Sequence, residues 1–139
     1  MHYLDTSVLA SFYYPEANSA AVQRELGRVE DQAISPLVRT ELFSALARRV
    51  RTKECPLDVA RQIGDLFRQH LRQGRYQLIP VMSDDYQLAE DWLARFDTSL
   101  RTLDAIHLAV VYHGGHTLLT SDRILAASAR KIGVPVRRI

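Results

Sequence analysis

Residues Met1–Ala10 read MHYLDTSVLA, and this stretch decides the fold. The run through Tyr3 and Leu4 is typical of a short buried strand, and it stops at Asp5. Thr6 and Ser7 then suit a helix start, because their hydroxyls can accept hydrogen bonds from unpaired amides. In an open parallel sheet the ligand site lies outside the carboxyl ends of the strands. Asp5 is therefore either a simple turn or N-cap residue, or the first member of a site at that edge.

Short strands alternate with amphipathic helices along the rest of the chain, which predicts an α/β domain with a mostly parallel sheet covered on both faces. We expect helices over residues 7–14, 16–29, 36–51, 57–71, 83–96 and 100–113 and through 124–129. We expect further strands over residues 32–34, 78–81, 116–120 and 134–139. Pro80 places its strand near a sheet edge or a strand end, because proline cannot donate to a strand ladder.

The composition is that of one ordinary globular domain. The chain has 139 residues, of which 47% are hydrophobic and 24% charged, so we expect a single domain over 1–139 with one core. Its start lacks the features of a signal peptide, and the single cysteine, Cys55, cannot form an internal disulfide. These features predict a cytoplasmic protein.

The basic residues are unusual in kind rather than in number. The formal net charge is only +2, but Lys53 and Lys131 are the only lysines among 18 basic residues. Arginine binds phosphate in a planar fork and stacks on bases, which favours a nucleic-acid or acidic-peptide partner. A GC-rich coding sequence explains the same bias equally well. The low net charge argues against a protein that simply coats nucleic acid, since such binding depends on a strong basic field.

Two acids lie beside apolar residues on predicted helices. Glu41 follows Val38 and precedes Leu42 and Ala45. Asp104 is surrounded at helical spacing by apolar residues, namely Leu100, Leu103, Leu108 and Val111. A buried polar group without a partner costs roughly 2–7 kcal/mol, so carboxylates in such places need a cation. No lysine lies near either of them in sequence.

A fourth acid, Asp122, ends the predicted strand 116–120 much as Asp5 ends the first. If these strands are neighbours, their acids face the same crevice as Glu41 and Asp104. A divalent ion would relieve the repulsion among four carboxylates, and oxygen ligands favour magnesium or manganese over zinc. Such an ion activates water and neutralises phosphate charge, which points to phosphodiester hydrolysis. Singly, Asp104 as an early-helix acid and Asp122 as an N-cap remain alternatives.

The other residues whose side chains could bind a metal or act as nucleophiles have simpler interpretations. His107 lies on an apolar helix face, where a histidine is more often a satisfied core residue than a metal ligand. His113 and His116 flank a Gly-Gly turn, and we expect them at the surface. Cys55 stands beside a proline without a nearby base, so we expect it to be inert. Asp84-Asp85 is most simply a helix-start pair.

Several of these segments together resemble the PIN-domain ribonucleases, and within them the VapC-type toxins of bacterial toxin–antitoxin pairs. The matching segments are Tyr3–Ser7, Ser35–Glu41, Leu103–Ala109 and Leu119–Asp122. They occur in the family's order and spacing, and the resemblance covers essentially the whole chain. Its specific part is Asp-Ala-Ile-His-Leu-Ala joined to a downstream Thr-Ser-Asp.

The resemblance implies a PIN-like three-layer α/β/α fold and a metal-dependent endoribonuclease that acts on structured RNA such as tRNA. It implies that one or two Mg²⁺ or Mn²⁺ ions are held by Asp5, Glu41, Asp104 and Asp122. Ser7 and Thr120 would assist by holding carboxylates or waters. It further implies a homodimer and inhibition by a cognate VapB-like antitoxin, for which residues 16–26 and 57–71 would offer helical surfaces.

Two rival functions belong to other classes. A catalytically silent PIN-like module would bind RNA or protein without cleaving, but it would have no reason to keep four mutually repelling acids. A receiver domain or aspartyl-phosphate enzyme also places an acid after its first strand. Against it, Asp5 lacks a second aspartate two positions on, and neither Lys53 nor Lys131 follows a predicted strand.

Overall fold

The computed structural model describes residues 1–139 as an α/β domain with five strands and seven helices. The strands are β1 (His2–Leu4), β2 (Gln32–Ile34), β3 (Gln77–Leu78), β4 (Thr117–Thr120) and β5 (Val136–Arg138). The helices are α1 (Thr6–Tyr13), α2 (Ser19–Leu26), α3 (Pro36–Arg51), α4 (Leu57–Arg72), α5 (Ser83–Leu93), α6 (Thr102–His113) and α7 (Arg123–Ile132). No helix is long and apolar enough to span a membrane.

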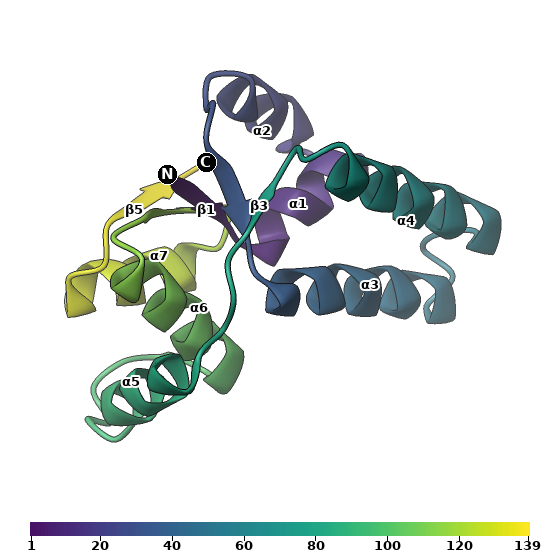
Figure 1. Cartoon of the computed structure of the whole chain (residues 1–139). Helices are drawn as coiled ribbons and strands as arrows, with labels where there is room; N and C mark the ends of the chain where they lie inside the picture. The colour runs from purple at the N-terminus through teal and green to yellow at the C-terminus, as the bar shows by residue number, and fades with distance from the viewer.

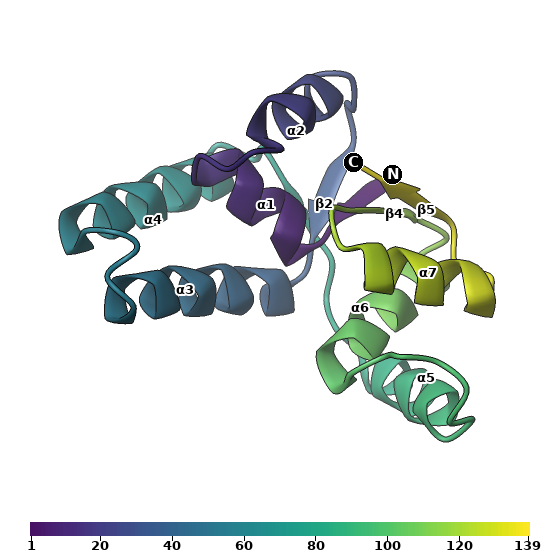
Figure 2. The ribbon, with the colours of Figure 1, turned by 180° about the vertical axis from the view of Figure 1, so that it is seen from behind.

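All strand pairs are parallel, and the strand order is β3-β2-β1-β4-β5. Helices α1 to α4 lie on one side of the strands and α5 to α7 on the other (Figure 1, Figure 2). The predicted three-layer α/β/α architecture with a parallel sheet is therefore confirmed. The strand order reverses direction next to β1, and the crevice at such a switch point is where open parallel sheets bind ligands.

Local caps explain where the helices next to this crevice begin. Asp5 is the N-cap of α1, and its side chain accepts a hydrogen bond from the Val8 amide. Ser35 caps α3 in the same way, with Pro36 in the first turn. Asp122 caps α7 by accepting from two amides. Each cap ties the polar end of a strand to the first turn of the next helix, so the acids stand at the sheet edge for local reasons.

The core lies on both faces of the sheet. Tyr3 and Leu4 of β1 and Leu118 and Leu119 of β4 are fully buried, as expected for central parallel strands. Helix α6 is apolar on nearly all sides, and every residue from Ala105 to Val111 is buried. A helix of this kind belongs inside the protein, which explains why its first turn is brought against the sheet edge.

Several predicted boundaries and core positions were wrong. The predicted strand 78–81 is only Gln77–Leu78, because Pro80 cannot continue the ladder, although the edge position is confirmed. The helices predicted from 16 and from 100 begin later, at Ser19 and Thr102, and β5 is shorter than 134–139. Phe96 lies beyond the end of α5 with a positive φ and is 92% exposed, so it is not part of the core.

Candidate active site

Residues from four helices or their N-caps line one small cavity at the carboxyl edge of the sheet. Its volume is about 140 Å³. The lining residues are Asp5, Thr6, Ser7, Glu41, Asp104, His107, Asp122 and Leu125. The four acids singled out in the sequence thus lie around one space, although they are far apart in the chain. Because β1 and β4 are neighbours with Leu4 opposite Leu119, Asp5 and the end of β4 meet directly.

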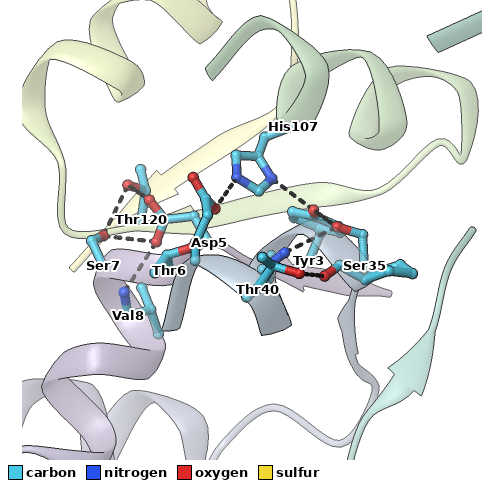
Figure 3. Close-up of polar contacts among 12 residues, drawn as sticks. Tyr3, Asp5, Thr6, Ser7, Val8, Ser35, Thr40, His107 and Thr120 are labelled. Atoms are coloured by element: carbon cyan, nitrogen blue, oxygen red, sulfur yellow. Dashed lines mark hydrogen bonds and ion pairs between the residues drawn. The ribbon is translucent and has the colours of Figure 1, made fainter. Parts of the chain in front are cut away.

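Asp5 is the most buried acid of the site and also the best supplied with donors. Its Oδ1 accepts from Ser7 Oγ at 2.7 Å and from the Val8 amide at 3.0 Å, and its Oδ2 accepts from Thr120 Oγ1 at 2.6 Å. Burial raises the pKa of Asp5, and the three hydrogen bonds offset part of this rise. The two hydroxyls therefore hold the carboxylate in place, as Figure 3 shows.

Glu41 is oriented by two side chains from other elements. Its Oε2 lies 2.6 Å from His107 Nε2 and accepts a hydrogen bond from Thr6 Oγ1 at 2.5 Å. Although partial burial acts to raise its pKa, the hydrogen bond and charge of His107, with the bond from Thr6, outweigh this and lower the pKa of Glu41. Its carboxylate is thereby kept ionised, with Oε1 free of protein donors.

His107 is itself held by a buried chain of hydroxyls. Its Nδ1 lies 2.8 Å from Tyr3 Oη, which lies 2.7 Å from Ser35 Oγ (Figure 3). His107 is 3% exposed and both of its ring nitrogens are hydrogen-bonded, so the prediction of a satisfied core histidine is confirmed. Its partner, however, is a carboxylate of the site.

Asp104 and Asp122 face the cavity from two helix starts. Asp104 lies in the first turn of α6, and its Oδ2 accepts a long hydrogen bond, 3.4 Å, from the Arg101 amide. Burial and the nearby Asp122 raise its pKa, against the lowering effect of Arg101. Asp122 Oδ1 accepts from the amides of Ile124 and Leu125. Asp104 is therefore an early-helix acid and Asp122 an N-cap, as the alternatives predicted, and both also line the cavity.

Comparison with known proteins agrees with this geometry. The family model of the PIN domain matches residues 2–131. The chain belongs to the PIN domain family. A sequence comparison with curated proteins finds no match.

Solved PIN-fold structures resemble the chain over most of its length. VapC20 of Mycobacterium tuberculosis, a toxin that cleaves the sarcin-ricin loop, has a TM-score of 0.74 and 22% identity over 92% of this chain and 95% of its own. FitAcB of Neisseria gonorrhoeae has a TM-score of 0.70 and 19% identity over 98% of this chain and 96% of its own. VapBC-5 of Mycobacterium tuberculosis, from a toxin–antitoxin system, has a TM-score of 0.67 and 18% identity over 99% of this chain and 98% of its own. At these identities the likeness shows a common fold.

The oxygens of this PIN-domain cavity suit a hard, hydrated cation. Glu41 Oε1, Asp104 Oδ1 and Asp122 Oδ2 accept no hydrogen bond from the protein. No three of the acidic or histidine side chains form a ready-made ligand cluster. Mg²⁺ commonly keeps several waters and uses one or two carboxylates together with substrate phosphate. The donor set therefore fits Mg²⁺ or Mn²⁺ bound partly through water.

The remaining predicted residues lie elsewhere in the PIN domain. Asp85 starts α5 by accepting from the Met82 amide, which confirms the helix-start role, and its other oxygen lies 2.7 Å from His113 Nδ1. His113 is partly exposed, as expected, but it is paired. Burial lowers the pKa of His116. Cys55 is buried and free, which agrees with its expected inertness.

Two features of the site were missed in the sequence. The sequence indicates for Thr6 only a helix start, yet its hydroxyl donates to Glu41, 35 residues away. The sequence indicates for Tyr3 only a buried strand position, yet its hydroxyl joins Ser35 to His107. The one sequence feature that points to these contacts is that the hydroxyls of Tyr3 and Thr6 lie within or next to an apolar segment. A buried hydroxyl needs a partner, but the sequence does not say which one.

Proposed function

We propose that this PIN domain is a metal-dependent endoribonuclease that hydrolyses phosphodiester bonds of structured RNA such as tRNA. The observation that carries the proposal is the convergence of Asp5, Glu41, Asp104 and Asp122 on one cavity at the carboxyl edge of the sheet. Keeping four acids together costs stability, since each carboxylate raises the energy of ionising the others. In a module that only binds RNA or protein, nothing would offset this loss of stability. In a metal-dependent nuclease, the bound cation offsets it.

Asp5, Asp104 and Asp122 would hold Mg²⁺ or Mn²⁺ as principal ligands, and Glu41 would hold it directly or through water. When bound, such an ion lowers the pKa of a water molecule and neutralises charge on the scissile phosphate. Ser7 and Thr120 fix the Asp5 carboxylate by donating to both of its oxygens.

Within this mechanism, Glu41 has the position of the group that orients the attacking water. Its Oε2 is held by Thr6 and His107, which restrains the carboxylate, and its Oε1 accepts no hydrogen bond from the protein. The lowered pKa keeps Glu41 ionised, so its carboxylate can accept a hydrogen bond from that water. His107 acts through Glu41 and is a positioning residue.

We further propose that the protein is the toxin of a cytoplasmic toxin–antitoxin pair, held inactive by a VapB-like antitoxin, and that it forms a homodimer. Support comes from the fold shared with VapBC-5, and from an apolar groove of about 540 Å³ between α3 and α4. Its apolar floor, including Phe43 and Leu46, is bordered by Arg51, Arg61 and Arg68. An amphipathic segment with acidic residues would fit there.

The test is cleavage of total cellular RNA by purified, antitoxin-free protein with Mg²⁺ or Mn²⁺, compared with EDTA. Wild type should give discrete metal-dependent cuts, and Asp5→Asn and Asp104→Asn should give none. Asp84→Asn, at an exposed acid outside the cavity, is the matched control and should cleave like wild type. A folded, metal-replete wild type that cuts no RNA in a broad pool would instead favour the silent binding module.

A further inference from the structure

A second cavity adjoins the acidic one and differs from it in charge. Its volume is about 360 Å³, and it shares Thr6, Ser7 and Asp122 with the active-site cavity. It continues between α1 and α3, past the loop that contains Glu16 and Asn18, and it ends at Arg48 and Arg49. The two cavities therefore adjoin, and together they define a path from the carboxylates toward Arg48.

Helix α3 forms one wall of this path, and it contributes Glu41 at the inner end and Arg48 at the outer end. Glu41, Ala45 and Arg48 are spaced at i, i+4 and i+7, so they lie in a row on one face of the helix. Seven residues at the helical rise place Arg48 about 10 Å beyond Glu41 along the axis. Because α3 runs away from the sheet edge (Figure 2), later positions in the helix lie farther from the sheet. The small side chain of Ala45 leaves the path open between them.

Arg48 is the unpaired basic residue of this second cavity. Its neighbour Arg49 is already occupied, because it pairs with Glu16 and Glu54 and its guanidinium stacks over the Tyr14 ring at 4.3 Å. Arg48 is exposed and takes part in no ion pair. A guanidinium with no acidic partner can present its planar fork to a phosphate.

Apart from Asp122 at its inner end and the Arg49–Glu16 ion pair, the other lining groups are neutral, and several of them form hydrogen bonds. Asn18 Nδ2 donates to Ser121 Oγ at 3.0 Å across the outer side of the path, and Ser11 Oγ donates to Glu16. Glu16 is neutralised by Arg49, so its charge does not oppose a phosphate there. The lining offers polar groups and one free cation but no exposed aromatic ring on which a base could stack. Such a surface suits a sugar-phosphate backbone rather than bases.

We propose that this cavity, the Arg48 groove, binds the single-stranded RNA backbone next to the scissile phosphate, with Arg48 contacting a neighbouring phosphate. The inference rests on the proposed ribonuclease function and deepens it. It also resolves an electrostatic difficulty, since a cavity of four carboxylates repels RNA on approach. A cation fixed at one side of the acids attracts the backbone and aligns it across the site.

Binding is measured with a fluorescein-labelled single-stranded RNA of mixed sequence, in the non-cleaving Asp5→Asn background with Mg²⁺, over a range of salt. Adding Arg48→Gln should weaken binding roughly tenfold and reduce the salt slope by about 1, as expected for the loss of one charged phosphate contact. Arg72→Gln, at an exposed, unpaired arginine on α4, is the matched control and should leave both unchanged. Ala45→Leu should weaken binding by narrowing the path without changing the salt slope.

Cleavage by otherwise wild-type protein separates this inference from the function on which it rests. Arg48→Gln should raise KM about tenfold with little change in kcat, because a backbone contact is equally strong in ground and transition states. If wild type cleaves but Arg48→Gln binds and cleaves like Arg72→Gln, the Arg48 groove is wrong and the ribonuclease stands. If wild type cleaves no RNA, the proposed function fails, and the groove proposal fails with it.

Discussion

Asp5→Asn should stabilise the metal-free protein although it abolishes cleavage. Asp5 is 4% exposed, and burial raises its pKa despite three hydrogen bonds, so its charged form is a net cost to the fold near neutral pH. Asparagine keeps the shape and an acceptor for Ser7 and Val8, and its amide can donate to Thr120 Oγ1. Removing such a functional penalty commonly adds about 0.5–2 kcal/mol to the free energy of unfolding. For a domain of this size that is roughly 2–8 °C in Tm.

The gain in stability of Asp5→Asn over wild type should increase as the pH rises. At a pH below the ordinary aspartate pKa, about 3.9, the carboxyl is protonated in both folded and unfolded chains, so wild type bears no penalty. As the pH rises, the unfolded chain ionises first and the folded state loses stability relative to it, until the raised pKa of folded Asp5 is passed. The difference in Tm between Asp5→Asn and wild type should therefore grow with pH and then level off.

The assay is thermal unfolding followed by circular dichroism on EDTA-treated protein, from about pH 4 to pH 8. Asp84→Asn is the control and should give no gain, because that acid is exposed in the first turn of α5, where a negative charge favours the helix. Adding Mg²⁺ should stabilise wild type more than Asp5→Asn. A variant no more stable than wild type at neutral pH, or a gap that narrows as the pH rises, would refute the reasoning.

Three further variants test other parts of the structure. Thr120→Val removes the donor 2.6 Å from Asp5 Oδ2, so the acidic limb of the pH–rate profile should move to higher pH, while Thr120→Ser should restore it. His107→Gln removes the partner that lowers the pKa of Glu41, and it should reduce cleavage about 10–100-fold in single-turnover assays with little change in RNA affinity. Phe67→Ala empties a fully buried position and should cost about 3–5 kcal/mol in urea unfolding, with cleavage by the folded fraction unchanged.

The sequence allowed the architecture to be predicted because its signals are local. Strand–helix alternation and apolar periodicity depend on neighbours within a few residues, and they led to the parallel α/β/α fold found here. Errors fell where tertiary packing decides a boundary or an exposure. Phe96 continues the apolar pattern of α5, but the chain turns away with a positive φ and leaves the ring in solvent.

The candidate site divides in the same way. That Asp5 and Asp122 end strands and begin helices could be read from short segments, because an N-cap acts within three residues. The assignment of these acids and of Glu41 and Asp104 to a metal site also drew on the family resemblance, and that role stays a prediction for the cleavage assay.

The sequence by itself determined the chemistry at the ends of the elements: which carboxylates, hydroxyls and arginines stand where a strand or a helix turn stops. Only the tertiary structure decided their partners. His107 meets Glu41 across 66 residues, Thr120 meets Asp5 across 115, and Arg48 is left free because Glu16 folds back onto Arg49. These contacts depend on β4 pairing with β1 and on the packing of α3 against α1. No local pattern encodes them, since they arise from adjacency in the sheet rather than from proximity in the chain.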